Sequence, residues 1–490
     1  MDYSVDSSGH LPSLRSLRRR IPISWVQLGV LFAVLAAVPF VKNVDPDFWW
    51  HLRTGKLIVA SGIPRHDPFS WTAAGRDWVA HEWFSEAIIY GVESTVGYIG
   101  NVLVFGVVTA SALALMYALG RRLGAGTKPL VLLTLLAAIV LVRFVTVRPQ
   151  VFTWLLLAVF VYILQRHDEG DSMPLWILPV LMAVWVNLHL GYVYGLMAVA
   201  VWILVQTWKR VRGAGSSLRT PLLVGSACLI ATFMNPSGPA ILWYPARYLF
   251  EGHAERSVVT EWQRPDFTSP AMAPITAALA LLVLSLVSQR RPFLTALSIA
   301  VVALSLQAVR NVPLAVLLLI PVVGSAAADR WTMASRARDS ATTLPTSLGA
   351  GLVVVMATAC LLAGVLFGGS ISGLHPSDDG YPAGGAAFLA SQHPGTRLFN
   401  DYNWGGYLIN RLYPVVPVFI DGREEFYGST IFGDYLRIIG GKPGWDMLLQ
   451  EYGVDVIIIR RDSGLAAALR SKSAWREEFT GPSEAIFVRR

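Results

Sequence analysis

Long apolar runs are the feature that most constrains how this chain can fold. A helix needs about 20 apolar residues to cross a hydrocarbon core of about 30 Å. Runs of this kind follow one another along most of the sequence. By this length criterion we expect about eleven membrane spans, at residues 22–42, 99–120, 129–147, 150–165, 174–189, 192–208, 220–235, 271–289, 292–309, 312–328 and 347–367.

Composition agrees with this interpretation. Charged residues make up 15% of the chain, whereas soluble globular proteins carry about 25%. This balance excludes an ordinary soluble enzyme and a disordered protein, and two cysteines, Cys228 and Cys360, are too few for a disulfide scaffold. The sequence therefore predicts a mainly α protein, a polytopic transmembrane helical bundle over residues 21–367, integral to the plasma (inner) membrane.

Lys and Arg residues predict the orientation of the bundle, because cytoplasmic loops are enriched in them. The segment before the first run carries Arg15, Arg18, Arg19 and Arg20, and every second connection is also basic. The N-terminus is therefore expected in the cytoplasm, with residues 1–20 as a disordered tail, and the C-terminus outside. The net charge of +8 then indicates contact with membrane lipid, so no nucleic acid is expected as a partner.

Two stretches are predicted to lie outside the membrane on the outer side. The first is the long loop at 43–98, which ends in an amphipathic stretch at 83–97. The second is the tail at 368–490, where strand-like and helix-like patterns alternate, so a small extracytoplasmic α/β domain is expected. Its expected strands are 417–421, 455–459 and 485–488, and its expected helices are 386–392 and 444–452.

The first outer loop concentrates acids, histidines and tryptophans. Asp45 and Asp47 directly follow the first span, and His81 with Glu82 comes later in the loop. Paired carboxylates at a membrane surface can hold a divalent cation, Mg or Mn, or accept a proton from a hydroxyl group. The alternative is that Asp-Pro only opens a turn.

Tryptophans in the same loop allow two interpretations. Trp49 and Trp50 could stack on the faces of sugar rings, since indoles have a large apolar surface. Tryptophans also gather at the membrane interface without any ligand. On the first interpretation both residues would bind an acceptor.

Three arginines near the outer ends of spans form a second group. They are Arg143, Arg148 and Arg310. Because a charge within a span is costly and a guanidinium fork matches phosphate oxygens, the three could hold a phosphate group. The alternative is that their side chains extend to lipid headgroups.

Polar residues between spans five and six could line the same cavity. Asn187 and His189 lie in the sequence WVNLHLG, where hydrogen bonding between helices is an equally good explanation. Glu261 lies in the outer loop before span eight and could act as an acid, a base or a ligand. A solvated loop carboxylate is the favoured interpretation for Glu261.

The tail contains an aromatic, glycine-rich stretch that could contact an acceptor. Trp404 and Tyr407 flank two glycines, and Asp421 ends a strand-like run. Glycines let a backbone approach a ligand closely, and aromatic rings with carboxylates suit sugars or peptides. Helix entry followed by a buried strand and a turn would explain much of the same pattern.

These motifs together resemble the GT-C superfamily of membrane glycosyltransferases. Those enzymes carry an acidic residue in the first outer loop, just after the first span. The sequence VDPDFWWHLRTG resembles that arrangement, and Asp45 matches the position of the acid. A closer resemblance is to the catalytic subunit of oligosaccharyltransferase, whose tail has a Trp-Trp-Asp-Tyr-Gly motif and an Ile-Asp-Gly strand end. Residues 400–407 and 420–422 are a degenerate version, with Phe399 and Asn400 in place of the two opening tryptophans. A second Asp-x-Asp after span three is absent.

The resemblance implies a GT-C-like transmembrane domain and transfer of a sugar from a polyprenyl-phosphate-linked donor to a glycan, lipid or protein acceptor at the outer face. Asp45 would be the general base, with Asp47 orienting it or holding a cation, and His81 and Glu82 would assist at the acceptor. The arginines would neutralise the leaving phosphate. The alternatives are a lipid or solute transporter or flippase, and a non-catalytic glycan-binding member of the fold. The enzymatic prediction requires the acids and the arginines to face each other across one outer chamber.

Overall fold

The structure is a computed structural model that describes residues 45–215, 217–250, 259–335 and 380–490. The predicted cytoplasmic tail and the predicted spans at 22–42 and 347–367 lie outside the described residues. Every other predicted span coincides with a helix. The helices of the bundle are α4 (Tyr98–Arg122), α5 (Thr127–Leu141), α6 (Gln150–Asp168), α7 (Ile177–Leu188), α8 (Tyr192–Val211), α9 (Arg219–Ala231), α10 (Ala240–Phe250), α11 (Ala273–Leu286), α12 (Pro292–Gln307) and α13 (Val312–Ser335). Short 3-10 helices between them are η3 (Thr232–Met234), η5 (Thr260–Trp262), η6 (Pro270–Met272) and η7 (Val309–Asn311).

Three described segments are long and apolar enough to cross a membrane: Tyr98–Arg122, Gln150–Asp168 and Val309–Arg330. The last of them covers most of α13, and 83% of its most apolar stretch is buried inside the structure. This burial is expected for the central helix of a bundle. Other apolar helices are shorter, with 10–17 residues. The total of about eleven spans stays a prediction.

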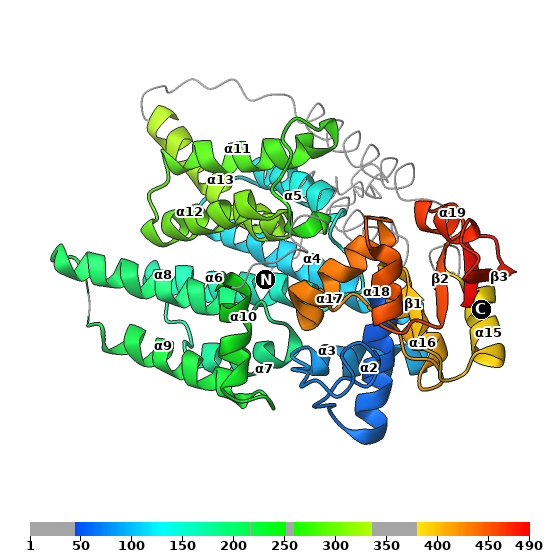
Figure 1. The fold of residues 1–490 in the computed structure, drawn as a ribbon. Helices are drawn as coiled ribbons and strands as arrows, with labels where there is room; N and C mark the ends of the chain where they lie inside the picture. Colours follow the sequence, from blue (N-terminus) through cyan, green and yellow to red (C-terminus); the bar gives the residue numbers. More distant parts are fainter. Residues whose placement is uncertain (1–44, 216, 251–258, 336–379) are drawn as a thin grey trace, which may run out of the picture.

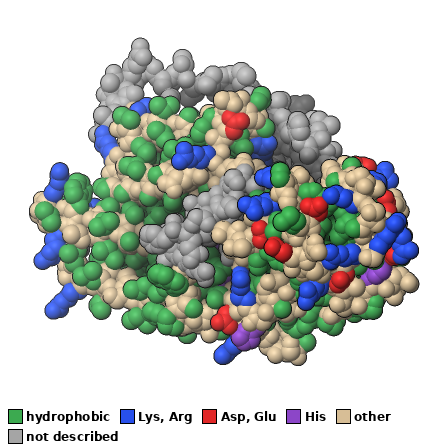
Figure 2. Space-filling model, in the orientation of Figure 1, with side chains coloured by type: hydrophobic (Ala, Val, Ile, Leu, Met, Phe, Trp, Pro, Cys, Tyr) green, Lys and Arg blue, Asp and Glu red, His purple; other side chains and the backbone are tan. Residues whose placement is uncertain are grey.

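The surface of the bundle is apolar over its length and basic at one end. Leu223, Leu284 and Val287 are 67–87% exposed, and Figure 2 shows hydrophobic side chains covering the helices. Lys and Arg side chains gather at the left end, where α8 leads into α9 and where Lys209 and Arg210 lie in the last turn of α8. The C-terminal domain lies at the opposite end of the bundle (Figure 1).

The first outer loop contains two helices, α2 (Phe48–Ser61) and α3 (Trp83–Val96). The second confirms the amphipathic stretch expected at 83–97, whereas the first was not predicted as a helix. The turn before α2 is closed by the Asp45 side chain, whose Oδ1 accepts the backbone N–H of Asp47 at 3.0 Å. This is the Asx turn typical of Asp-Pro sequences, and it fixes both carboxylates at the start of a helix.

The tail is an α/β domain with a small mixed sheet, as predicted. Its strands follow the order β1-β2-β4-β3, with β1 parallel to β2 and the other pairs antiparallel. The strands are β1 (Leu398–Asn400), β2 (Val456–Arg460), β3 (Trp475–Thr480) and β4 (Glu484–Arg489). The helices are α15 (Ala383–Gln392), η9 (Tyr402–Trp404), α16 (Gly405–Leu412), α17 (Glu424–Ile439), α18 (Trp445–Glu451) and α19 (Gly464–Arg470).

The prediction of a strand at 417–421 is wrong. Val418 forms only an isolated bridge, and its partner is Ser70 of the first outer loop. The side chain of Asn400 takes the place of a neighbouring strand, because it accepts the N–H of Phe419 at 2.9 Å and donates to the carbonyl of Ile420 at 2.8 Å. The first loop and the tail, expected as separate outer pieces, therefore pack together.

Candidate active site

The guanidinium of Arg148 joins carboxylates from separate parts of the fold. Arg148 lies between α5 and α6, and its Nη2 atom is 2.7 Å from Oδ2 of Asp47. Its Nη1 atom is 2.8 Å from Oε1 of Glu261, in η5, and 3.9 Å from Oδ2 of Asp45. The acids after the predicted first span thus face an arginine from the connection between α5 and α6.

The carboxylates around Arg148 alter the ionisation of Asp47. Burial raises the pKa of Asp47 well above its ordinary value of 3.8, against the lowering effect of Arg148. The negative charges of Asp45, Glu424 and Glu261 raise it further. Asp47 therefore binds a proton more readily than a carboxyl in water, and its ionisation responds to any charge that enters or leaves the site.

Arg310 supplies a second guanidinium to the same region. It lies in η7, and its Cζ atom is 3.7 Å from the ring centroid of Trp262, a cation–π contact. Because Trp262 follows Glu261 in η5, one short helix contacts both guanidiniums. Arg148 and Arg310 also both act electrostatically on His189. Two of the three arginines predicted to hold a phosphate therefore lie at one site.

Three histidines converge on the carboxylate of Glu82. The Nε2 atoms of His189, His81 and His51 lie 3.4, 3.5 and 3.8 Å from its oxygens. All of these residues except His51 were predicted from the sequence as site residues. The spacing could have found it, because His51 lies four residues after Asp47 and therefore on the same face of α2.

The hydrogen-bond partners of the histidines indicate which ring nitrogens carry protons in this cluster. The N–H of Gly191 donates to Nδ1 of His189 at 2.9 Å, so the ring proton of a neutral His189 is on Nε2 and points at Glu82. Both nitrogens of His81 face oxygen acceptors, with Nδ1 at 3.2 Å from the carbonyl of Val79, which suits an imidazolium. Burial would raise the pKa of Glu82, but the three histidines together, His81 above all, outweigh this effect and hold the pKa below 4.5.

Glu86 extends the cluster between α2 and α3. Its Oε1 atom lies 3.3 Å from Nδ1 of His51, and its side chain is 1% exposed. Burial raises the pKa of Glu86 well above 4.5, and the charge of Glu82 adds to this effect. Burial lowers the pKa of His51 from 6.5 to about 3. A protonated Glu86 can donate to Nδ1 of a neutral His51, whose Nε2 then faces the carboxylate of Glu82 at 3.8 Å.

Replacing Glu86 with glutamine is expected to remove part of the pH dependence of stability. Because folding raises this pKa, the stabilising contribution of Glu86 is complete below about pH 4.5 and is lost as pH rises toward the folded pKa. Glutamine imitates the protonated acid at every pH. The unfolding free energy of Glu86→Gln, relative to that of the wild type, should therefore increase by up to about 1.4 kcal/mol per pH unit in that window.

Thermal unfolding in detergent over a pH series measures this difference. Glu451→Gln is the matched control, because Glu451 is exposed and its replacement should leave the pH dependence unchanged. Parallel curves for Glu86→Gln and the wild type would show that Glu86 is ionised in the folded protein.

Asn187 and Arg143, both predicted to bind a phosphate, make hydrogen bonds to other parts of the bundle in the structure. The Oδ1 atom of Asn187 accepts from Nε1 of Trp83 at 2.7 Å and from Nδ2 of Asn235 at 3.3 Å, and its Nδ2 donates to the carbonyl of Ala183 at 2.7 Å. This is the hydrogen bonding between helices that the sequence left as the alternative. Arg143 is exposed and donates to a backbone carbonyl, that of Ala271. A phosphate role for Arg143 stays a prediction.

The tryptophans and the tyrosine predicted to bind an acceptor are buried in an interface. Trp49 packs edge-to-face on Tyr407, with ring centroids 5.2 Å apart. Trp49, Trp50, Trp404 and Tyr407 are all at most 7% exposed. The contact between Trp49 and Tyr407 joins α2 to α16, and Gly406 lets the two backbones approach, whereas Trp404 donates to the carbonyl of Gly380. Their burial leaves little surface for an acceptor.

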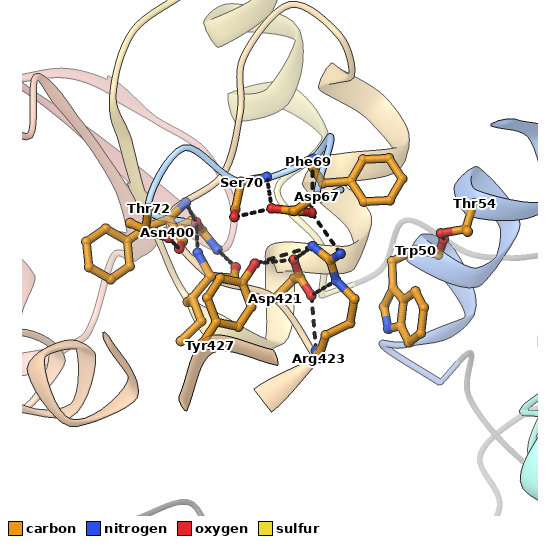
Figure 3. A network of polar contacts seen from close by, with 12 residues as sticks. Trp50, Thr54, Asp67, Phe69, Ser70, Thr72, Asn400, Asp421, Arg423 and Tyr427 are labelled. Carbon is orange, nitrogen blue, oxygen red and sulfur yellow. Dashed lines mark hydrogen bonds and ion pairs between the residues drawn. The ribbon is translucent and has the colours of Figure 1, made fainter. Parts of the chain in front are cut away.

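Asp421, the fifth residue predicted to bind an acceptor, belongs to a buried ionic network. Arg423 donates to both oxygens of Asp421, at 2.7 and 2.6 Å, and to Oδ1 of Asp67 at 2.8 Å (Figure 3). The side chains of Asp67 and Asp421 have no exposed surface and that of Arg423 has 3%. Asp67 also accepts the N–H of Ser70 at 2.9 Å. The network therefore connects the first outer loop to the C-terminal domain.

A cation held by Asp45 and Asp47 stays a prediction. Within the described residues, no group of three or more His, Cys, Asp or Glu side chains is placed to hold a metal ion. The guanidinium of Arg148 already contacts the Asp47 carboxylate. Arg148 is therefore the positive partner of this carboxylate in the structure.

A cavity of about 250 Å³ lies between the first outer loop and the connection that follows η3. Its lining includes Arg65, Trp78 and Ala80, together with Pro236 and Ser237. Ligand pockets for drug-sized molecules are usually larger, about 300–1,000 Å³. The cavity therefore suits a small group, such as one sugar ring.

Comparison with known proteins identifies the fold and leaves the activity open. No family model and no curated protein matches this chain. The apo structure of ArnT from Cupriavidus metallidurans matches with a TM-score of 0.51 and 15% identity, over 95% of this chain and 96% of that chain. A mutant of the arabinofuranosyltransferase AftD from mycobacteria matches with a TM-score of 0.54 and 15% identity, over 95% of this chain and 41% of that chain.

A second ArnT structure, bound to undecaprenyl phosphate, is less similar, with a TM-score of 0.46 and 16% identity over 95% of this chain and 97% of that chain. The expected resemblance is confirmed for the fold: the chain has the fold of the GT-C membrane glycosyltransferases. With its apolar helices, this fold is that of an integral membrane protein.

Proposed function

We propose that this protein is a membrane glycosyltransferase that moves a sugar from a polyprenyl-phosphate-linked donor to an acceptor hydroxyl at the outer face of the membrane. The observation that carries the proposal is the contact between Arg148 and the carboxylates of Asp45 and Asp47. A transfer of this kind needs a base for the acceptor and cations for the leaving phosphate, and both occur here within one site.

The proposed reaction has a single displacement step. The acceptor oxygen forms a bond to the anomeric carbon while the bond from that carbon to the phosphate oxygen breaks. Asp45 takes the acceptor proton, and the polyprenyl phosphate leaves with the electron pair of the broken bond. Arg148 and Arg310 stabilise the charge that develops on the phosphate, because guanidinium groups pair with phosphate oxygens.

The geometry favours Asp45 over Asp47 as the base. One oxygen of Asp47 lies against Arg148 at 2.7 Å, and the other lies against the backbone at Gly422. Asp45 has one oxygen in the Asx turn, whereas the other is 3.9 Å from Arg148. This second oxygen is close enough to be polarised by the guanidinium, yet it can still accept a proton.

The histidine cluster is proposed to bind the acceptor. Glu82 fixes the ring of His81, whose neighbour Ala80 lines the cavity between the first loop and the η3 connection. Trp78 lines the same cavity and offers an apolar surface to a sugar ring.

The proposed donor and orientation follow from two further observations. ArnT, whose apo structure shares this fold, is also known in complex with undecaprenyl phosphate. Lys209 and Arg210 lie at the end of the bundle opposite the C-terminal domain, which favours a cytoplasmic position for that end and an outer position for the site.

Transfer in liposomes tests the proposal against its rivals. The purified full-length chain, reconstituted with a radiolabelled polyprenyl-phosphate sugar and lipid or glycan acceptors, is expected to release polyprenyl phosphate and label an acceptor. Movement of the intact donor between leaflets without cleavage would support a flippase instead. Donor or glycan binding without either event would support a non-catalytic member of the fold.

A further inference from the structure

The C-terminal domain reaches the site through consecutive residues at the start of α17. Gly422 lies against Asp47, Arg423 binds Asp67, and Glu424 contacts Trp262. Figure 3 shows Asp421 and Arg423 beside Asp67. The domain is therefore attached to the site itself and not only to the outside of the bundle.

The contact at Gly422 leaves no room for a side chain. A Cβ atom built on Gly422 would lie 1.9 Å from Oδ1 of Asp47 and 3.3 Å from Nε1 of Trp50. The backbone of the C-terminal domain thus packs directly on the carboxylate that pairs with Arg148. A shift of this segment would move Asp47.

Glu424 makes the next contact, with Trp262 of η5. Its Oε1 atom accepts from Nε1 of Trp262 at 2.9 Å, and its other oxygen accepts from the hydroxyl of Tyr402. The ring of Trp262 carries the guanidinium of Arg310 at 3.7 Å. Glu424 is 8% exposed, so its charge acts on both Asp47 and Arg148 with little screening.

We infer that Glu424 is a positioning residue of the site, supplied by the C-terminal domain: it holds Trp262 under Arg310 and sets the electrostatic environment of Asp47. This inference rests on the proposed function for its activity readout. Its contacts do not touch the reacting atoms, so the effect of Glu424 is exerted through Trp262 and through charge.

The charge effect has a defined sign. Asp47 faces Asp45 from its own segment, Arg148 from the α5–α6 connection, Glu261 from η5 and Glu424 from α17. Of these groups, the three carboxylates raise the pKa of Asp47 and Arg148 lowers it. Removing the charge of Glu424 should therefore lower that pKa. If ionised Asp47 is needed to orient Arg148, the acidic limb of the pH–rate profile moves to lower pH.

Glu424→Gln removes the charge and keeps the oxygen that accepts from Trp262, while its NH2 group replaces the oxygen that accepts from Tyr402. In the full-length protein in liposomes, the acidic limb of kcat/KM should shift down by about one pH unit. Glu424→Ala also removes the acceptor for Trp262, and it should raise the KM for the lipid-linked donor about tenfold or more. Asp434→Asn is the matched control, since Asp434 lies on the same helix and accepts from the hydroxyl of Tyr452 at 2.9 Å.

A second measurement does not depend on activity. Because folding raises the pKa of Asp47, its contribution to stability is lost as pH rises above its ordinary value of 3.8. The unfolding temperature of Glu424→Gln should therefore fall less steeply with pH than that of the wild type. The difference should become smaller when both proteins carry Asp47→Asn, because the part that depends on Asp47 is then absent.

The two measurements separate the possible failures. If the wild type transfers no sugar but the coupling between Glu424 and Asp47 is present, the proposed function fails and the positioning role stands. An unchanged pH profile in Glu424→Gln, or a pH-dependent stability difference of the same size with and without Asp47→Asn, would overturn the inference. Loss of folding in Glu424→Ala alone leaves the test to the glutamine variant.

Discussion

Arg148→Gln is expected to lower sugar transfer by about 100- to 1,000-fold, the usual effect of removing one donor that stabilises developing charge. Arg148 contacts Asp45, Asp47 and Glu261, and its loss also leaves these carboxylates to repel one another. The principal effect should be on kcat, because the charge on the phosphate is largest as the leaving group departs. Initial rates with the lipid-linked donor measure it.

Two further variants show whether this loss is chemical. Arg148→Lys keeps the charge but loses the planar fork, so it should recover only part of the activity. Glu261→Gln removes a carboxylate that competes with the phosphate for Nη1 of Arg148, so it should retain transfer and lower the KM for the donor. Equal activity of Arg148→Gln and the wild type would remove Arg148 from the mechanism.

The stability of the Arg148→Gln protein must be measured together with its transfer activity. Removing one partner of a fully buried ion pair costs about 3–5 kcal/mol. The Arg148 side chain keeps 21% exposure, so the cost here should be smaller. An Arg148→Gln protein that unfolds at a similar temperature but transfers no sugar would assign the loss to the reaction.

The helices of the bundle were predictable because hydrophobic length and periodicity are local properties of the sequence. The strands at 456–460 and 484–489 were predictable for the same reason, since both are runs of apolar residues. The segment at 417–421 has the same composition, yet it pairs with the first loop. That outcome depends on the side chain of Asn400, which is brought to it only by the folded domain.

The site was predictable where the chemistry of a residue was unusual for its place. Asp45 and Asp47 stand out as a pair of carboxylates directly after a predicted span, and Arg148 stands out as an arginine at the start of another. The contacts of Glu261 and Glu424 could not be predicted, since each is a common loop or helix carboxylate in the sequence. Glu261 was interpreted as a solvated carboxylate, and the structure instead pairs it with Arg148 at 2.8 Å.

Asp45→Asn is expected to reduce transfer by about 100- to 10,000-fold, the range for loss of a general acid or base. Asparagine has the same shape and keeps an oxygen that can accept the N–H of Asp47 in the Asx turn, so α2 should start as before. It cannot take the acceptor proton. Transfer assays with unchanged donor binding and an unchanged unfolding temperature would locate the loss in the proton-transfer step.

Asp47→Asn provides the comparison that assigns the base. Its carboxylate is closed in by Arg148 on one side and by Gly422 on the other, so its removal should weaken the orientation of Arg148 and cost about tenfold in kcat. Because the pKa of Asp47 is raised, the variant should also lose the acidic limb that this group controls. If instead Asp47→Asn were inactive and Asp45→Asn active, Asp47 would be the base in spite of its limited access, and Asp45 would be the group that orients Arg148.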